Sequence, residues 1–209
     1  MKLAFLGAPG AGKSLLARKT INKLKAQGRT NWGLVDGYVE ALATQTGMPF
    51  GANSNFGREL SVITTRWIRE AQLFKDQKHS LTCGTFYESF IYTTIFSIFT
   101  STDEKVIAQQ SQNAQFIMQI LGFIEATTWD YDAIFLLPLP ESKKDPEDRN
   151  WYQVIDAKLP EVLEGFNKKF FMLDQQTDKE KTKFVIEIID QIENYYEQIA
   201  TATYDQSGV

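Results

Sequence analysis

The sequence predicts an α/β fold of three layers, in which a five-stranded parallel sheet lies between two layers of helices. Five short apolar runs alternate with longer stretches whose apolar residues recur at helical spacing. The first apolar run stops at a glycine-rich turn that opens directly into a helical stretch. A length of 209 residues, with 43% apolar and 23% charged residues, fits one globular domain over residues 1–209 with a small lid loop at 141–150.

The first half of the chain alternates strand and helix. Residues 2–6 are an apolar run that stops at glycine, as a buried strand does, and Leu15, Leu16, Ile21 and Leu24 then keep helical spacing up to the stop signal at Gly28. The run 32–35 repeats the pattern, and the breaker-rich segment 47–53 separates two helical stretches. The elements expected here are strands at 2–6, 32–35 and 80–83 and helices at 13–26, 38–46 and 58–77.

The second half continues the same alternation. The stretch 87–99 is apolar on nearly all sides, which predicts a mostly buried helix, and 104–126 is long and amphipathic. The run 133–137 ends in Pro138-Leu139-Pro140, and a charged loop follows it. The elements expected here are strands at 133–137 and 169–173 and helices at 87–99, 104–126, 151–166 and 182–200.

The turn after the first strand has the residues of a phosphate-binding loop, or P-loop. Glycines let consecutive backbone N–H groups point inward, and the helix that follows adds its N-terminal N–H groups and the positive end of its dipole. Lys13 is expected to reach the β- and γ-phosphates of a nucleotide and to act in catalysis, and Ser14 to place its hydroxyl on Mg²⁺. The expected nucleotide-binding residues are Gly7, Ala8, Pro9, Gly10, Ala11, Gly12, Lys13, Ser14 and Leu15.

Composition excludes several other classes of protein. Cys83 and His79 are the only residues of their kinds, so neither a disulfide nor a zinc site of cysteines and histidines is expected. A net charge of −4 without a long basic run argues against a nucleic-acid partner. The sequence shows no secretion signal, and its most apolar segment is too short for a membrane helix. We therefore expect a cytoplasmic protein without a membrane partner.

Asp36 is the leading candidate for acid chemistry. It follows the second expected strand, and ligands of open α/β sheets bind beyond the carboxyl ends of the strands. Its carboxylate there suits a general base for a hydroxyl nucleophile or a ligand to a Mg²⁺ water. The alternative is a helix N-cap, for which aspartate is equally suited.

Arginines supply the candidate cations. Arg149 lies in the charged loop after the fourth strand, where it is expected to stabilise charge in phosphoryl transfer, the alternative being a solvated loop. Arg58, Arg66 and Arg69 lie on or near one expected helix. Two interpretations fit them: they bind a phosphate group of the acceptor, or they form an ordinary solvated helix face.

With these motifs in place, the sequence resembles the P-loop nucleoside and nucleotide kinases, and within them the small kinase-like ATPase domains related to nicotinamide riboside kinase. Beyond the P-loop, the resemblance involves the acid after strand two, a Gln/Glu-rich helix end, a strand that ends in prolines, and an Asp-x-x-Arg-like lid. These features are Leu34-Val35-Asp36-Gly37-Tyr38, Arg69-Glu70-Ala71-Gln72, Phe135 to Pro140, and Asp145 to Arg149. The resemblance implies ATP and Mg²⁺ as cofactors, with Ser14 and Asp36 at the metal.

One segment departs from the family pattern. Such kinases usually end strand three with an acid, often followed by arginine, and this chain has Cys83-Gly84-Thr85 there instead. Glu88, one turn further on, is the residue that could substitute.

Three functions remain open on the sequence. The first is a kinase that transfers the γ-phosphate of ATP to a hydroxyl of a small acceptor, by resemblance a nucleoside, a nucleotide or a related riboside. The second is an ATPase that transfers phosphate to water, and the third is a nucleotide-binding module without catalysis. An Asn-Lys-x-Asp sequence that would select guanine is absent, which favours adenine nucleotides. The oligomeric state is left open.

Overall fold

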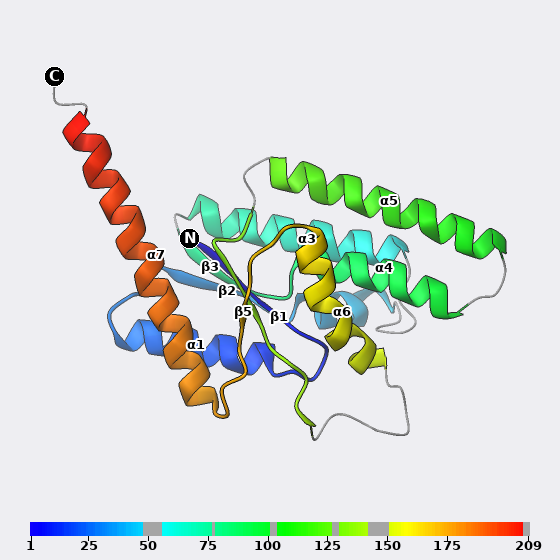
Figure 1. The fold of residues 1–209 in the computed structure, drawn as a ribbon, viewed down its shortest axis with the longest axis horizontal. Helices are drawn as coiled ribbons and strands as arrows, with labels where there is room; N and C mark the ends of the chain where they lie inside the picture. Colours follow the sequence, from blue (N-terminus) through cyan, green and yellow to red (C-terminus); the bar gives the residue numbers. More distant parts are fainter. Residues whose placement is uncertain (48–55, 77, 101–103, 127–129, 142–150, 207–209) are drawn as a thin grey trace.

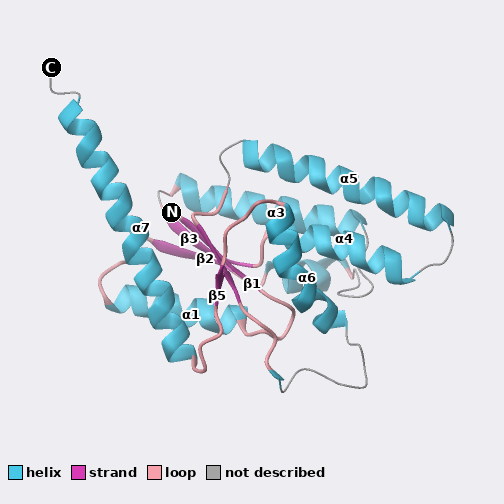
Figure 2. Ribbon diagram, in the orientation of Figure 1, coloured by secondary structure: helices cyan, strands magenta, loops and turns pink. Residues whose placement is uncertain are grey.

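The computed structural model describes residues 1–47, 56–76, 78–100, 104–126, 130–141 and 151–206. Its centre is a five-stranded sheet in the order β2-β3-β1-β4-β5, in which every neighbouring pair is parallel (Figures 1 and 2). The strands are Lys2–Leu6 (β1), Trp32–Val35 (β2), His79–Cys83 (β3), Ala133–Leu136 (β4) and Phe171–Met172 (β5). The predicted five-stranded parallel sheet is thereby confirmed.

Helices connect the strands and cover the sheet. They are Lys13–Ala26 (α1), Tyr38–Thr46 (α2), Phe56–Lys75 (α3), Phe86–Thr100 (α4), Glu104–Ala126 (α5), Trp151–Gly165 (α6) and Asp178–Gln206 (α7). In Figure 1, α1 and α7 lie to one side of the sheet and α3, α4 and α6 to the other, with α5 packed on α4 as an outer helix. No helix of the described part combines the length and apolarity needed to cross a membrane.

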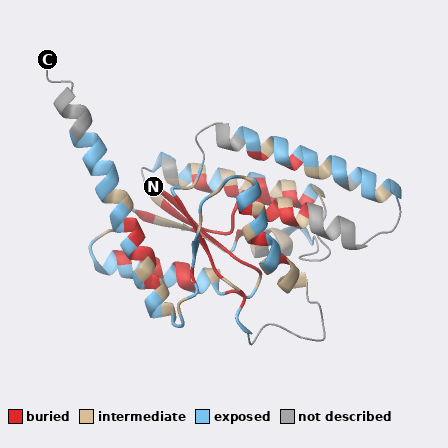
Figure 3. Ribbon diagram, viewed as in Figure 1, coloured by how far each residue is buried: buried red, intermediate tan, exposed pale blue. Residues whose placement is uncertain are grey.

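Alternation along the strands builds one core on each face of the sheet. Successive side chains of a strand point to opposite faces, so Phe5 and Phe135 join the core under α1 and α7, whereas Leu6 and Leu136 join the core under α3, α4 and α6. Figure 3 shows the central strands buried and α5 mostly exposed. Burial on both faces explains why β4 is apolar throughout and β1 is apolar after Lys2.

The structure differs from the predicted bounds chiefly at the end of the chain. Strand β5 has two residues rather than five, and it lies at the edge of the sheet with both side chains exposed. Helix α7 begins at Asp178 rather than at 182, because Thr177 and Glu180 cap it reciprocally. Thr177 Oγ1 accepts from the Glu180 N–H at 3.2 Å, and Glu180 Oε2 accepts from the Thr177 N–H at 3.0 Å.

The parallel arrangement brings the carboxyl ends of three neighbouring strands, β2, β3 and β1, to the same end of the sheet. Gly7 follows β1, Asp36 follows β2, and Cys83 is the last residue of β3. Because these strands are neighbours in the sheet, residues far apart in the sequence meet at this end. The candidate site lies there.

Candidate functional site

The phosphate loop runs from Gly7 to Gly12, between β1 and the 14-residue helix α1. Gly12 is the N-cap of α1 with φ of 92°, a left-handed conformation that favours glycine. No side chain caps this end of the helix. The first backbone N–H groups of α1 and its positive dipole end therefore have no side-chain cap and are available to an anion.

Lys13 lies folded over the loop that precedes it. Its Nζ donates to the carbonyl oxygens of Gly7 and Ala8, the latter at 3.3 Å, and forms an ion pair with Glu88 Oε1 at 3.6 Å. The ammonium group thus sits at the mouth of the loop with carbonyl contacts that incoming phosphate oxygens can replace.

Asp36 is a partner of the phosphate loop and not a helix cap. The N-cap of α2 is Gly37, and no side chain caps that helix. Asp36 Oδ1 accepts from Ser14 Oγ at 2.7 Å, and Oδ2 accepts from Arg18 Nη2 at 3.2 Å. Partial burial by itself raises the pKa of Asp36, but hydrogen bonds from Ser14 and Arg18 outweigh it and hold this pKa below its ordinary value. The carboxylate is therefore ionised at neutral pH.

Cys83 supports this ionisation from β3. Burial first, and then the charge of Asp36, raise the pKa of the Cys83 thiol to about 12, so the thiol stays protonated. It then donates a hydrogen bond to Asp36. The sequence analysis gave Cys83 no role at the site, whereas its place at the end of β3 was the signal that could have revealed one.

Glu88 takes up the space beyond the end of β3. It lies in the first turn of α4 and forms ion pairs with Lys13 and, through Oε2, with Arg66 Nη2 at 3.7 Å. The Arg66 side chain on α3 is only 2% exposed, and it also donates from Nε and Nη2 to the hydroxyl of Tyr38. A carboxylate thus reaches the phosphate loop although β3 itself ends without one.

Gly84 makes this arrangement possible, and we expect its replacement by alanine to disturb it. A Cβ at position 84 would lie 2.3 Å from Glu88 Oε2 and 2.5 Å from Arg66 Nη2, at a φ of 91°. Gly84→Ala should lower the free energy of unfolding by about 2 kcal/mol or more, since backbone strain and steric overlap add. Thermal denaturation measures this loss.

Gly28→Ala is the matched control for that substitution. Gly28 has a similar φ of 82°, but an added Cβ there would meet nothing within 4 Å. Gly28→Ala should lower the free energy of unfolding only by the cost of the backbone conformation, about 1 kcal/mol, and should leave nucleotide binding unchanged. Equal losses in the two variants would contradict the close approach of Glu88 and Arg66 to Gly84.

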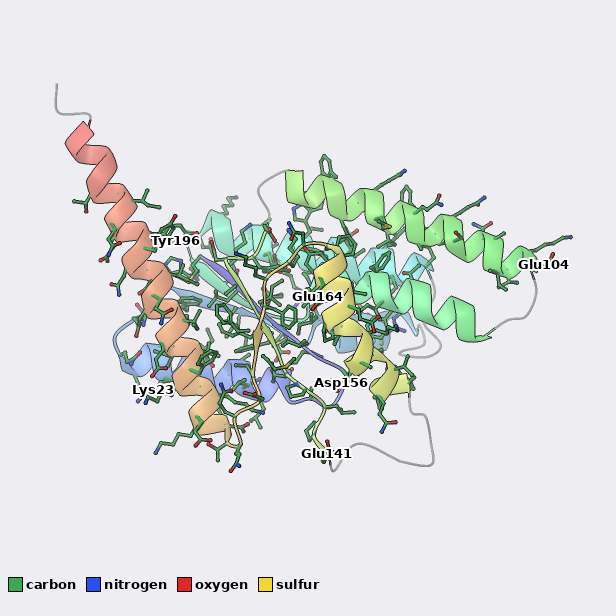
Figure 4. All side chains as sticks on the ribbon, viewed as in Figure 1. Lys23, Glu104, Glu141, Asp156, Glu164 and Tyr196 are labelled. Atoms are coloured by element: carbon green, nitrogen blue, oxygen red, sulfur yellow. The ribbon has the colours of Figure 1, made fainter. Side chains whose placement is uncertain are left out.

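A cavity of about 680 Å³ joins these groups. It is lined by the phosphate loop and Asp36 and by side chains of α3, α4 and α6. Helix α6 is fixed near this end of the sheet because Asp156, labelled in Figure 4, accepts from the backbone N–H of Leu139 at 2.8 Å. A cavity of this size accommodates a nucleotide or another small ligand.

The predicted site residues fall into three groups. Pro9, Gly10, Gly12, Lys13, Ser14, Leu15 and Asp36 all line this cavity. Gly7, Ala8 and Ala11 complete the loop, the last two through a hydrogen bond from Ala11 N to Ala8 O at 3.1 Å. Arg149, Lys143 and Lys144 lie outside the described residues, as does the expected lid loop except for Glu141.

The three arginines of α3 do not share one environment. Arg58 and Arg66 are buried and line the cavity, so a solvated helix face describes neither of them. Arg69 is exposed, and its guanidinium lies 5.9 Å from the ring centre of Tyr38. Helical spacing placed these residues on one helix, but it could not indicate which of them face the cavity.

Ser14 and Asp36 are a fitting pair of ligands for Mg²⁺. Their hydrogen-bonded oxygens are a hydroxyl and an ionised carboxylate, which are ligands that a hard cation prefers. Within the described ranges, no three His, Cys, Asp or Glu side chains gather to hold a metal on their own. Mg²⁺ is commonly held by one or two protein oxygens together with substrate phosphates, and this pair matches that pattern.

Comparisons with known proteins place the fold. No family model and no curated protein sequence matches this chain. Among solved structures, the NadR protein in complex with NAD and AMP-PNP matches with a TM-score of 0.63 and 12% identity, over 89% of this chain and 48% of NadR. Thymidylate kinase from Ehrlichia chaffeensis matches with a TM-score of 0.56 and 12% identity, over 91% of this chain and 98% of the kinase.

This chain has the fold of the P-loop nucleoside and nucleotide kinases. A third kinase, deoxyadenosine kinase from M. mycoides with bound dATP, agrees with a TM-score of 0.55 and 14% identity, over 91% of this chain and all of that one. The chain spans about half the length of NadR and nearly the whole length of the two shorter kinases. At such identities the likeness establishes the kinase fold, as the sequence predicts.

Proposed function

We propose that this protein is a kinase that transfers the γ-phosphate of ATP to a hydroxyl group of a small acceptor, namely a nucleoside, a nucleotide or a related riboside. The observation that carries this proposal is the size and lining of the cavity. Its volume is about 680 Å³, and it is lined by Lys13, Ser14 and Asp36 together with polar and aromatic side chains of three helices. Such a cavity has room for a phosphate donor and for a second molecule beside it, which hydrolysis would not require.

The residues suit in-line transfer of a phosphoryl group. The acceptor oxygen would form a new bond to the γ-phosphorus, the bond from that phosphorus to the β–γ bridging oxygen would break, and ADP would leave with the electron pair. Lys13 and the N-terminus of α1 would stabilise charge on the phosphates. Ser14 and Asp36 would hold Mg²⁺, which offsets the negative charge of the β- and γ-phosphates when bound.

Asp36 has two roles open to it in this mechanism. Its ionised carboxylate can accept the proton of the attacking hydroxyl, or it can orient a water ligand of Mg²⁺. Glu88 lies on the other side of Lys13 and would restrain that side chain by charge. This second acid weakens the case for a non-catalytic module, which rested on the lack of an acid at the end of β3.

The test is a transfer screen with γ-labelled ATP and Mg²⁺ against nucleosides, nucleotides and nicotinamide ribosides. Label should move to at least one acceptor, at a rate well above its release as inorganic phosphate. Release to water alone would favour the ATPase, and the kinase proposal would then be wrong.

Arg149 remains a prediction by resemblance. If it stabilises charge that develops during transfer, Arg149→Ala should lower kcat by about tenfold or more and change the dissociation constant of ATP little. Steady-state kinetics and ATP titration measure the two quantities separately. Lys144→Ala, a charge removal in the same loop, is the control. A normal kcat in the Arg149 variant would contradict the assigned role.

A further inference from the structure

Three aromatic side chains from outside the phosphate loop form an aromatic wall of the cavity. Trp151 and Tyr152 of α6 and Tyr92 of α4 line it. The rings of Trp151 and Tyr152 have centroids 4.0 Å apart, and Tyr92 meets Trp151 edge-on at 6.2 Å. All three side chains are only partly buried, so part of their surface remains accessible to a ligand. Aromatic rings of this kind stack on flat heterocycles.

Two charged residues of α3 line the same cavity. Arg58 and Glu59 are both buried and both line the cavity, and Glu59 acts on the Arg58 guanidinium electrostatically. Together they present N–H donors and carboxylate acceptors. A nucleobase carries hydrogen-bond acceptors for the N–H groups and donors for the carboxylate along its edge, and its flat ring matches the aromatic wall. An aliphatic acceptor or a sugar alone has no flat surface for that wall.

The charges of the lining are balanced before any ligand binds. The described lining residues include three cations, Lys13, Arg58 and Arg66, and the same number of carboxylates, those of Asp36, Glu59 and Glu88, of which Asp36 is also paired with Arg18 outside the lining. Lys13 lies at the phosphate loop, where the triphosphate of ATP would engage it. Arg66 is held by Glu88 and by the hydroxyl of Tyr38, at 2% exposure.

A phosphate on the acceptor would upset this balance. A monophosphate brings almost two further negative charges into a cavity that already takes up the triphosphate. Arg66 forms an ion pair with Glu88, and Arg58 lies within electrostatic reach of Glu59. Drawing Arg66 away would leave Glu88 buried without that partner. An acceptor without charge meets no such cost.

We propose, on the basis of the proposed kinase function, that the acceptor is a nucleoside without a phosphate group. Its base lies against the aromatic wall with an edge toward Arg58 and Glu59, and its sugar hydroxyl faces Asp36 and the γ-phosphate. The hydroxyl oxygen forms the bond to the γ-phosphorus, ADP leaves with the bonding electron pair, and the hydroxyl proton passes to Asp36 or to water. The product is a nucleoside monophosphate.

The experiment compares each nucleoside with its own 5′-monophosphate as acceptor for γ-labelled ATP. Purine, pyrimidine and nicotinamide pairs are tested at equal concentration, the first two in both ribose and deoxyribose forms. We expect at least one nucleoside to be labelled with a kcat/KM at least 100-fold above that of its monophosphate. Preferred or equal labelling of the monophosphate would overturn this inference and leave the kinase proposal intact. Labelling of neither kind would overturn both.

A variant of the aromatic wall tests where the base lies. Tyr152→Leu keeps an apolar side chain on α6 but removes the ring, and it should raise the KM for the nucleoside about tenfold while the KM for ATP stays within twofold. Tyr195→Leu, an exposed tyrosine of α7 outside the cavity lining, is the matched control and should change neither value. A Tyr152 variant with an unchanged nucleoside KM would contradict the assigned wall.

Nucleoside binding gives a readout that does not depend on turnover. A nucleoside that stacks near Trp151 should change the tryptophan fluorescence of the wild-type chain in a saturable way. A Trp151→Phe variant should lose most of that change and keep the other three tryptophans. A fluorescence response that is the same in both proteins would overturn the placement of the base.

Discussion

Lys13→Ala should abolish phosphoryl transfer while the fold stays intact. The lysine is the cation nearest to the phosphate loop, where it contacts the carbonyl oxygens of Gly7 and Ala8. Removal of a main counter-charge in a preorganised site costs about 3–4 kcal/mol of transition-state stabilisation, or roughly several hundred-fold in kcat/KM. The measurement is steady-state transfer from ATP to the best acceptor found.

The matched control for Lys13→Ala is Lys23→Ala. Lys23, labelled in Figure 4, is an exposed lysine of the same helix outside the cavity lining. Both variants should unfold within about 1 kcal/mol of wild type, since exposed or functional charges add little to stability. A Lys13→Ala protein with wild-type turnover would show that the phosphate loop does not perform the reaction.

Asp36→Asn should lower transfer by about two to three orders of magnitude. The amide keeps the size of the carboxylate but neither takes up a proton nor binds Mg²⁺ with a negative charge. Because Asp36 is not a helix cap, and its contacts with Ser14 and Arg18 lie at the protein surface, thermal stability should change little. Transfer rates measured over a range of Mg²⁺ concentrations separate the two roles.

The dependence of the Asp36→Asn transfer rate on Mg²⁺ concentration shows whether Asp36 acts as a metal ligand or as a general base. A variant that recovers at high Mg²⁺ has lost mainly a metal ligand, whereas one that remains slow has lost a base. Equal activity of Asp36→Asn and wild type would instead direct attention to Glu88, whose replacement by glutamine is then the next variant.

The low pKa of Asp36 also sets a pH dependence. A carboxyl group with a lowered folded-state pKa stays ionised until the pH falls through that pKa, so activity that needs the carboxylate should persist down to below its ordinary value of 3.8. Arg18→Ala removes one of the stabilising hydrogen bonds and should shift the acid limb of the rate profile to higher pH. An unshifted limb would mean that Arg18 does not control the ionisation of Asp36.

The sequence predicted the first elements of the fold very well because their signals are local. The bounds of β1, α1, β2 and α2 agree with the structure, since each apolar run is closed by a glycine, an aspartate or another strong breaker. The observed bounds of the later elements differ from the predicted bounds where such signals were weaker or were overlooked. The capping pair of Thr177 and Glu180 was visible in the sequence and would have placed the start of α7 correctly.

The residues of the candidate site also differ in how far local sequence signals reveal them. The phosphate loop and Asp36 could be predicted because they follow strands that a local pattern reveals. The contact between Arg66 and Glu88 could not, because it depends on how α3 and α4 pack and on the missing side chain of Gly84. The part of the cavity formed by Arg58, Glu59 and Tyr152 also depends on that packing, so the sequence left the acceptor open.

The fate of the γ-phosphate tests the central claim most directly. Wild-type protein in excess over ATP, with Mg²⁺ and a mixture of nucleosides, nicotinamide riboside and their monophosphates, is followed by ³¹P nuclear magnetic resonance through a single turnover. A kinase predicts that the γ-phosphate signal of ATP disappears as the signal of a newly phosphorylated acceptor grows in equal amount. Conversion of the γ-phosphate to inorganic phosphate alone, or an ATP spectrum that never changes, would contradict it.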